Sequence, residues 1–347
     1  MDTQALLEAV NQICLTRGIN PEDVFEALER ALAEAYKKEH PTATVRVEIN
    51  PKTGSIMILV KKEVVKQVQD PDTQVSLDEA KNLVPDAKIG DSIEFEIPIG
   101  TLGRITASMT KRMLQRVLRD AELKAFVRLY EDKVGKAISG KILFLRKDRI
   151  IVELERGNAI FPLEEQVETE FYEIGKRYKF LVKEVINEEF NRRVILSRKD
   201  PQFIKALFEL EVPELRSGQV EITNIAREAG VRTKVAVKAL DESIDPLGTL
   251  IGPKGIRINA VMSEIAPETV DVIKWAINPA DFIRNALAPA KTLSAKVDPK
   301  KKKATVYVAP EQYEVALGKN GVNVRLAEEI TGYTIDIVKK ETEGAAK

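Results

Sequence analysis

Apolar residues recur at two different spacings between the N-terminus and Tyr130. A spacing of three or four residues predicts amphipathic helices, and strict alternation predicts half-buried strands. One of the helices opens on Asn20-Pro21-Glu22-Asp23, which has a capping residue, a proline at the first helical position and an acidic first turn. The predicted elements are helices over 4–16, 21–38, 77–82 and 101–130 and strands over 45–49, 55–68 and 92–97. Together they form a small α+β head that ends in one long helix.

The pattern changes between residues 133 and 199, where short strand signals follow one another with glycines at the corners. Five strands in about 65 residues are typical of a small closed barrel of the OB type, as in S1 domains. A different small β-barrel without a ligand remains an alternative. The predicted strands are Ala137–Phe144, Arg149–Leu154, Asn158–Pro162, Arg177–Val185 and Arg193–Ser197.

Residues 200–341 contain an internal repeat. Each copy has the order helix, strand, strand, short helix, Gly-x-x-Gly, helix, strand, and the two Gly-x-x-Gly loops begin at Gly252 and Gly318. A single such loop is a weak signal because it occurs in many turns. Two copies with helices in the same places around them predict two tandem KH domains of type II. The fold class is therefore α+β multidomain, with predicted domains at 1–132, 133–199, 200–277 and 278–347.

The two loops are the leading candidates for binding single-stranded RNA. Glycine has no Cβ, so a nucleic-acid backbone can approach closely, and the following helix directs free N–H groups toward a phosphate. Lysine and arginine beside the loops add positive charge. The predicted RNA-binding residues are Gly252, Pro253, Lys254, Gly255, Ile256 and Arg257 in the first copy and Gly318, Lys319, Asn320, Gly321, Val322 and Arg325 in the second.

Three further candidates lie in the predicted barrel. Phe144, Arg146 and Phe161 lie on or beside strands that we expect to face the ligand side of an OB sheet. Stacking of a base on an aromatic ring contributes about 1–3 kcal/mol. The alternative is that both phenylalanines belong to the barrel core. In the second repeat the run Lys300-Lys301-Lys302-Lys303 falls in a turn between two strands. Such a run is usually a solvated hairpin tip, and the alternative is that it lengthens the track for phosphates.

Composition narrows the function classes. Charged residues make up 31% of the chain, yet the formal net charge is zero, so positive charge for RNA must be local. With one cysteine, Cys14, and one histidine, His40, catalytic triads and His- or Cys-rich metal sites are nearly excluded. Asp70-Pro71-Asp72 and Asp241-Glu242 lie at predicted turns without supporting residues. We therefore expect no enzyme, no cofactor and no metal.

The remaining sequence signals concern location and partners. There is no apolar run of about 20 residues and no secretory signal pattern, so the expected location is cytoplasmic. The long helix carries many basic residues and few acidic ones. Arg104, Lys111, Arg112 and Arg116 on this helix are candidates for contacting a partner protein, and a solvated helix face is the alternative for each.

Several local motifs accompany this order of parts: Val24-Phe25-Glu26-Ala27-Leu28-Glu29-Arg30-Ala31-Leu32, Gly103-Arg104-Ile105-Thr106-Ala107, Glu211-Val212-Pro213-Glu214, Asp245-Pro246-Leu247-Gly248, Asn278-Pro279-Ala280-Asp281-Phe282-Ile283 and Gly321-Val322-Asn323-Val324-Arg325-Leu326-Ala327. Together, the order of parts and these motifs resemble the NusA family of bacterial transcription elongation and termination factors. The resemblance covers nearly the whole chain.

This resemblance implies a function that spacing alone does not. Proteins of the family bind RNA polymerase core through the head, near the β-flap and the RNA exit channel, and take up single-stranded nascent RNA on the barrel and KH domains. They modulate pausing, intrinsic termination and antitermination, together with other Nus-type factors. We expect a monomer that acts in this way. An RNA-decay or ribosome-associated adaptor remains the alternative, because pairs of barrel and KH domains occur there as well.

Overall fold

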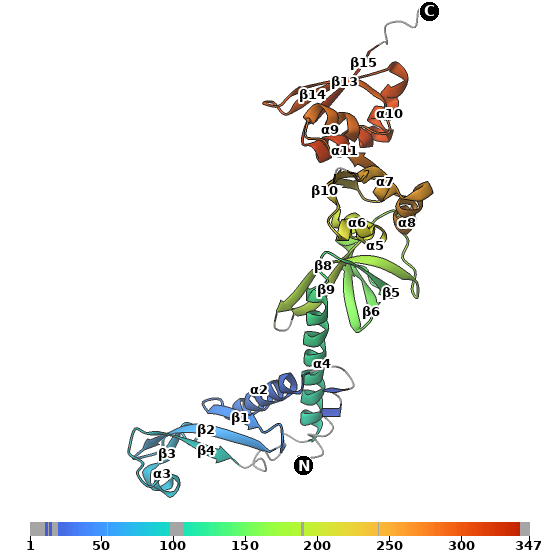
Figure 1. The fold of residues 1–347 in the computed structure, drawn as a ribbon. Helices are drawn as coiled ribbons and strands as arrows, with labels where there is room; N and C mark the ends of the chain where they lie inside the picture. The colour runs from blue at the N-terminus through green and yellow to red at the C-terminus, as the bar shows by residue number, and fades with distance from the viewer. Residues whose placement is uncertain are drawn as a thin grey trace, which may run out of the picture. The chain divides into compact units, whose positions relative to one another are not determined.

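The computed structural model describes residues 11–12, 14–15, 20–53, 55–97, 107–188, 191–241 and 243–340, with the side chains of 107–114 excepted. Contacts divide the chain into two compact units (Figure 1): Met1–Arg128 with Asn187–Arg192, and Leu129–Ile186 with Arg193–Lys347. The predicted boundaries after residues 132, 199 and 277 remain predictions. In the part of the chain that the structure describes, no helix has the length and hydropathy needed to cross a bilayer.

The head is built on a four-stranded sheet in the order β1-β2-β3, with β4 also paired to β2. Its elements are α2 (Pro21–Glu39), β1 (Thr44–Ile49), β2 (Ile56–Val65), β3 (Gln74–Ser76), α3 (Leu77–Leu83) and β4 (Ser92–Ile97). The predicted start of α2 is confirmed, because the Asn20 side chain accepts a hydrogen bond from the Glu22 backbone N–H at 3.1 Å. The three-residue strand β3 was not predicted.

The long helix α4 (Ala107–Glu131) follows the head sheet. Val117 and Ala121 of α4 pack with Val24 and Leu28 of α2 in one apolar cluster. At the edge of this cluster, Asp23 accepts a hydrogen bond from the Lys124 ammonium group at 2.5 Å and lies 3.6 Å from the Arg128 guanidinium. Most of the predicted helix over 4–16 and residues 101–106 lie outside the described residues.

Five strands form a closed barrel in the order β5-β6-β7-β9-β8, which confirms the OB-like prediction. The strands are β5 (Ala137–Leu145), β6 (Arg149–Leu154), β7 (Gly157–Pro162), β8 (Arg177–Glu188) and β9 (Asn191–Ser197). Alternate residues such as Val152, Ala159 and Phe180 fill the interior. A β-bulge interrupts the pairing of β5 with β6 between Ile142 and Phe144.

Both predicted KH repeats are present. We call the first KH1; it consists of α5 (Gln202–Glu211), α6 (Pro213–Arg216), β10 (Val220–Glu228), β11 (Arg232–Ala239), α7 (Pro246–Ile251), α8 (Ile256–Glu264) and β12 (Thr269–Lys274). The second, KH2, consists of α9 (Pro279–Ala286), β13 (Thr292–Asp298), β14 (Lys303–Val308), α10 (Tyr313–Leu317), α11 (Val322–Thr331) and β15 (Thr334–Lys339). Among these helices and strands, only the short helix α6 was not predicted.

The two KH sheets have the same topology. In each, the first strand is antiparallel to the second and the second is parallel to the third, in the orders β10-β11-β12 and β13-β14-β15. One face of each sheet packs against the helices of its own repeat. The other face of the KH1 sheet packs against α9 and α11 of KH2, so one apolar cluster contains Ala236, Ile273, Val322 and Leu326 from both repeats.

Candidate nucleic-acid interface

The KH1 loop connects two helices through a tight backbone path. Asp245 caps α7 by accepting hydrogen bonds from the backbone N–H groups of Leu247 and Gly248. The chain then takes positive φ at Gly252 (74°), Lys254 (53°) and Gly255 (76°) before α8 begins. A Cβ at position 252 would lie 2.7 Å from Cγ of Arg257, so the glycine is needed for the backbone path and also for close packing of the next helix.

The KH2 loop repeats this geometry. Positive φ occurs at Gly318 (74°), Asn320 (54°) and Gly321 (74°). A Cβ at position 318 would lie 2.7 Å from Cβ and 2.9 Å from the backbone nitrogen of Asn323. Asn323 is the counterpart of Arg257, since each is the second residue after the last glycine of its loop. The same pair of positions is therefore in close contact in both repeats.

The counterparts Arg257 and Asn323 also make the same type of hydrogen bond. Arg257 donates to the Thr249 carbonyl at 2.8 Å, and Asn323 donates to the Val315 carbonyl at 3.3 Å. Thr249 and Val315 are themselves counterparts in the helices that precede the loops. Each bond ties the helix after the loop to the helix before it. The loops are therefore held in shape by their own repeat, without a ligand.

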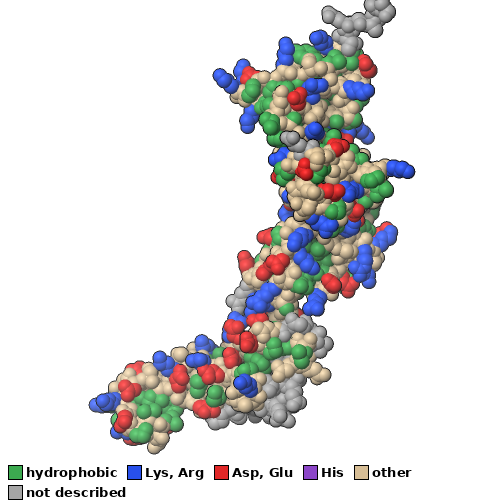
Figure 2. All heavy atoms as spheres, viewed as in Figure 1, with side chains coloured by type: hydrophobic (Ala, Val, Ile, Leu, Met, Phe, Trp, Pro, Cys, Tyr) green, Lys and Arg blue, Asp and Glu red, His purple; other side chains and the backbone are tan. Residues whose placement is uncertain are grey.

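The residues at the two loop tips are open to solvent. Pro253, Lys254, Lys319 and Asn320 are exposed. Among the described residues, neither Lys254 nor Lys319 has an ion-pair partner, so both ammonium groups are available to a phosphate. The surface elsewhere carries acidic and basic side chains interspersed (Figure 2), in keeping with the zero net charge.

The first residue after each loop differs between the repeats. Ile256 is 65% exposed and presents an apolar side chain beside the KH1 loop, whereas Val322 is 7% exposed and packs in the cluster between KH1 and KH2. The Val322 side chain fills the interface with KH1, so the predicted part of Val322 in RNA binding would fall to its backbone, and it stays a prediction. Only the N–H end of its helix faces the loop.

The two candidate arginines are also placed differently. Arg257 has an ion pair with Glu214 at 3.1 Å in addition to its bond to Thr249, and its side chain is 25% exposed. Arg325 is 51% exposed, donates to the Asn320 carbonyl at 2.5 Å and pairs with Glu228 of KH1 at 2.9 Å. Arg257 therefore supports the loop, whereas Arg325 lies at the surface beside it.

A pocket of about 390 Å³ lies between the KH2 loop and the end of the KH1 hairpin. KH2 contributes Gly318, Lys319, Asn320 and Arg325, and KH1 contributes Glu228, Val231, Arg232 and Thr269. The KH1 side of this pocket therefore places one carboxylate, that of Glu228, and one guanidinium, that of Arg232, opposite the KH2 loop.

The two aromatic candidates in the barrel differ in exposure. Phe144 is 57% exposed, since the β-bulge beside it adds a residue and alters which side chains face outward. Arg146, after the end of the same strand, is exposed. Phe161 is fully buried and packs edge-on against Phe180 and Tyr172, so its prediction as a base-stacking residue is wrong and the core alternative holds.

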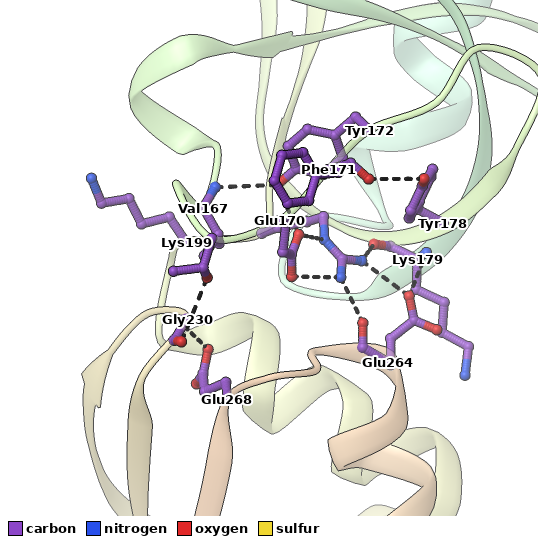
Figure 3. Close-up of polar contacts among 12 residues, drawn as sticks. Val167, Glu170, Phe171, Tyr172, Tyr178, Lys179, Lys199, Gly230, Glu264 and Glu268 are labelled. Atoms are coloured by element: carbon purple, nitrogen blue, oxygen red, sulfur yellow. Dashed lines mark hydrogen bonds and ion pairs between the residues drawn. The ribbon is translucent and has the colours of Figure 1, made fainter.

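Buried charges join the barrel to KH1 (Figure 3). The guanidinium of Arg198, 1% exposed, donates to both carboxylate oxygens of Glu170, at 2.6 and 2.8 Å, and to the Lys179 carbonyl at 2.6 Å, all within the barrel. It also donates to the carboxylate and the carbonyl of Glu264 in KH1, at 3.0 and 2.7 Å. Burial alone would lower the pKa of Arg198, but the hydrogen bonds to Glu170 raise it, so Arg198 stays charged.

A second buried pair lies within KH1 itself. Arg227 and Glu268 have side chains that are 0% and 1% exposed and approach to 2.9 Å. Glu268 also accepts hydrogen bonds from the Thr233 hydroxyl at 2.5 Å and the Gly230 backbone N–H at 2.8 Å, while Arg227 donates to the carbonyls of Arg198 and Asp200. These paired charges hold the end of the barrel against the KH1 sheet.

Of the four candidate residues in the predicted long helix, the structure describes the side chain of one. Arg104 lies outside the described residues, as do the side chains of Lys111 and Arg112. Arg116 is described and exposed. Across the described ranges, no group of three or more His, Cys, Asp or Glu side chains is arranged to hold a metal ion.

Comparison with known proteins bears on the whole chain. The NusA N-terminal domain matches residues 5–124, the NusA-like first KH domain matches 198–275, and the NusA-like second KH domain matches 279–345. The transcription termination/antitermination protein NusA of Bacillus subtilis is 37% identical over 339 residues, which cover 97% of this chain and 91% of that protein. This chain belongs to the NusA family.

A second NusA relative agrees with this assignment. The Thermus thermophilus protein of the same name is 38% identical over 347 residues, covering 96% of this chain and 90% of that protein. The solution structure of the N-terminal domain of NusA from B. subtilis is 36% identical and covers 35% of this chain and 98% of that one, with a TM-score of 0.28. The closed barrel lies between the matched NusA N-terminal and first KH segments, which completes the expected NusA order of domains.

Proposed function

We propose that this chain is an RNA-binding transcription factor of termination and antitermination that holds single-stranded nascent RNA on its two Gly-x-x-Gly loops. Membership of the NusA family supports the role in transcription. The observation that carries the RNA site is the pair of matching loops, each shaped by its own repeat and each with an exposed lysine at the tip. A helix N-terminus follows each loop, which favours a phosphate group.

The loops differ in what they offer a nucleotide. The KH1 loop presents Lys254 and the apolar surface of Ile256, so it suits a phosphate followed by an unstacked base. The KH2 loop presents Lys319 and Arg325 but faces the Glu228 carboxylate. KH1 is therefore the stronger RNA site of the two.

Acidic substitutions in the loops test the RNA site. Replacing Pro253→Asp and Lys254→Asp, together with Lys319→Asp and Asn320→Asp, places carboxylates where phosphates would lie. Aspartate tolerates the left-handed conformation found at positions 254 and 320, so the loops should keep their shape. We expect at least a tenfold loss of affinity for single-stranded RNA, measured by fluorescence anisotropy.

A control for each loop pair, tested singly, adds the same charge elsewhere. Lys52→Asp with Thr53→Asp alters an exposed turn of the head by as much charge as one loop substitution. Its RNA affinity should equal that of the unaltered chain. Undiminished affinity in the loop variant would exclude the two loops as the RNA site.

The head supplies the second half of the proposed function. We infer that it docks on RNA polymerase core, near the β-flap and the RNA exit channel, and that Arg104, Lys111, Arg112 and Arg116 contact the polymerase or the emerging RNA. A monomer acting with other Nus-type factors by binding alone, without catalysis, is the form that fits this role. The family supports polymerase binding in general, and the individual residues are our proposal.

Removing residues 1–125 tests the docking site. The truncated chain should lose co-purification with core polymerase and should bind RNA as the full chain does, which also checks that the remainder is folded. If the truncated chain still co-purifies with polymerase, the head is not the docking site. Recovery of nuclease or ribosomal subunits in place of polymerase would favour the adaptor alternative.

A further inference from the structure

The sheets of KH1 and KH2 differ on the face that is turned away from their own helices, which we call the outer face. In KH1 this face is a protein interface. Ala226, Lys234, Ala236 and Ile273 lie on it, each at most 2% exposed, and α9 and α11 of KH2 cover it. Three of these four side chains are apolar, and the two alanines allow close approach of α11.

Strand register identifies the matching positions in KH2. Asp271 of β12 and Asp336 of β15 are counterparts in the repeat, and they lie opposite Lys234 and Thr305 respectively. From these two positions, the strand register gives the KH2 counterpart of each outer-face residue of KH1, including those on β10 and β13. The counterparts of Ala226, Lys234, Ala236 and Ile273 are Lys296, Thr305, Tyr307 and Val338.

The KH2 outer face therefore carries a ring and a positive charge where KH1 has two alanines. Tyr307 is half-buried on the central strand, between Ser294 on one side and the 40% exposed Val338 on the other. The Lys296 ammonium lies over the Tyr307 ring, 5.9 Å from its centroid, so a base that stacks on this ring displaces the flexible lysine toward the flanking phosphate. The residues on either side of Tyr307, Val306 and Val308, point into the core, so the ring belongs to the outer face.

The hairpin that joins β13 to β14 extends this face with four lysines. Lys300, Lys301, Lys302 and Lys303 are all exposed, and basic side chains project from this hairpin at the left of the uppermost domain in Figure 2. The Asp298 carboxylate accepts hydrogen bonds from the backbone N–H groups of Lys300 and Lys301 at 3.1 and 3.2 Å, which fixes the turn. Within the described residues, none of these four ammonium groups has an ion-pair partner.

We propose that the outer face of the KH2 sheet is a second surface for single-stranded RNA. Tyr307 stacks on a base, Val338 packs beside that base, and Lys296 and the hairpin lysines bind the phosphates on either side. An aromatic ring on a sheet with lysines around it is the arrangement that proteins use to bind single strands without sequence preference. The choice of RNA as the ligand rests on the proposed function, but the surface uses no residue of the Gly-x-x-Gly loops.

The chemistry of the face favours RNA over two other occupants. A further KH copy would have to seat a helix where Ala226 and Ala236 admit α11, and Lys296 and Tyr307 fill that space in KH2. An acidic protein would be attracted to the lysines but would make no particular use of a partly exposed ring flanked by an aliphatic side chain. A nucleotide uses both the charge and the ring.

The test starts from the full chain with both loops changed to Asp-Asp, so that residual binding reports on the outer face. The probe is a fluorescein-labelled uridine oligonucleotide of about 20 nucleotides at low salt, measured by anisotropy. Adding Tyr307→Ala should lower the residual affinity about fivefold or more, the loss of one base stack. Tyr307→Phe keeps the ring and should bind within about twofold of the parent.

The charge is tested separately. Lys300→Gln, Lys301→Gln and Lys303→Gln together should lower the residual affinity and flatten its dependence on salt. A control with Lys37→Gln, Lys52→Gln and Lys81→Gln loses the same charge from exposed positions of the head and should bind as the parent does. Circular dichroism of each variant identifies any loss of folding, and ultraviolet cross-linking of RNA to the peptide containing Tyr307 in the unaltered chain would support stacking directly.

Three results would overturn the second surface. The first is that the loop variant shows no measurable RNA binding. The second is that it binds RNA equally well with alanine and with tyrosine at position 307. The third is that it binds polyglutamate and not RNA, and that this binding is lost when the hairpin lysines are replaced. Failure of the loop site is a distinct result. If the loops do not bind RNA, the loop variant and the unaltered chain have equal RNA affinity, whichever residue occupies position 307.

Discussion

KH1 and KH2 have the same fold and opposite surroundings. KH1 lies between the barrel and KH2, and its central strand β11 is buried on both faces from Thr233 to Val237. KH2 packs on KH1 through α9 and α11 and leaves the outer face of its own sheet to the solvent. The buried pair of Arg227 with Glu268 in KH1 has no counterpart in the open copy, because Glu268 corresponds to Tyr333 of KH2.

This difference shows that topology and loop geometry can be shared while the energetic roles of the copies diverge. KH1 joins the barrel through buried, paired charges, which are costly to disturb. KH2 has surface charges that are free to meet a ligand. The only tryptophan, Trp275, lies at the end of β12 in the apolar cluster between the copies, so its fluorescence reports on their junction.

The largest expected effect comes from breaking the buried pair of KH1. Arg227→Met leaves the Glu268 carboxylate buried without its partner, and we expect a loss of about 3–5 kcal/mol in the free energy of unfolding. Urea denaturation followed by Trp275 fluorescence measures it. Glu221→Gln, which removes the partly exposed pair with Lys238, should cost less than about 1 kcal/mol. Similar losses for both variants would show that burial does not distinguish these pairs.

For the loop glycines we expect the larger loss of stability in KH2 and the smaller one in KH1. Gly252 and Gly318 share a φ of 74°, but an added Cβ meets the flexible Arg257 side chain in KH1 and the backbone nitrogen of Asn323 in KH2. Gly318→Ala should therefore cost about 3 kcal/mol and Gly252→Ala about 1–2 kcal/mol, measured by the same denaturation. Equal costs would mean that backbone conformation alone sets the penalty.

The buried lysine of the KH1 outer face should make stability depend on pH. Burial lowers the pKa of Lys234 from 10.5 to about 8, against the opposing effect of Asp271. Between these two values the unfolded chain binds more protons than the folded one, so this group raises stability as pH increases. The difference between the two pKa values corresponds to about 3 kcal/mol in the free energy of unfolding.

A variant without the titrating group isolates this effect. Between pH 7.5 and 10, the unaltered chain should gain about 2–3 kcal/mol in the free energy of unfolding relative to Lys234→Met. Thr305, the KH2 counterpart, does not titrate, so Thr305→Met should leave the pH dependence unchanged. Parallel curves for the unaltered chain and Lys234→Met would contradict the inferred cost of the buried charge.

The smallest effect concerns the ion pair between the copies at the surface. Glu228→Gln releases Arg325, which is half exposed, and should change stability by less than about 1 kcal/mol. It also removes the carboxylate that lines the pocket at the KH2 loop, so RNA affinity should rise about two- to threefold, with Glu221→Gln as the control. A decrease in affinity would mean that Glu228 positions Arg325 for the RNA.

Local patterns predicted most of the fold. Asn20-Pro21 set the start of α2, and strands such as β4 and β13 begin and end where alternation begins and ends. The repeat predicted both KH topologies because it shows helix, strand and loop signals in the same order twice. The exceptions, β3 and α6, are three and four residues long, too short for a periodic pattern to form.

Contacts between distant segments could not be predicted in the same way. Phe161 is a plausible stacking residue by type, but the alternation of β7 turns it inward. Val322 occupies a loop-flanking position like Ile256, and only the packing of KH2 on KH1 buries it. Charged residues in strands, such as Arg227 and Lys234, were the one available sign of the buried interface. Their partners lie far along the chain, at Glu268 and Asp271, which a pattern of neighbouring residues does not show.

The open KH2 sheet also determines how far such an array of repeats can extend. Arrays of stacked repeats need an end unit with a polar outer surface, since an exposed apolar face would recruit another chain. Lys296 and Tyr307 give KH2 that property, whereas the alanines at positions 226 and 236 make KH1 an internal unit. Stacking a third copy on this face in the same way would require small apolar residues at positions 296 and 307, so a few side chains on one face of a sheet decide whether it can take another KH unit.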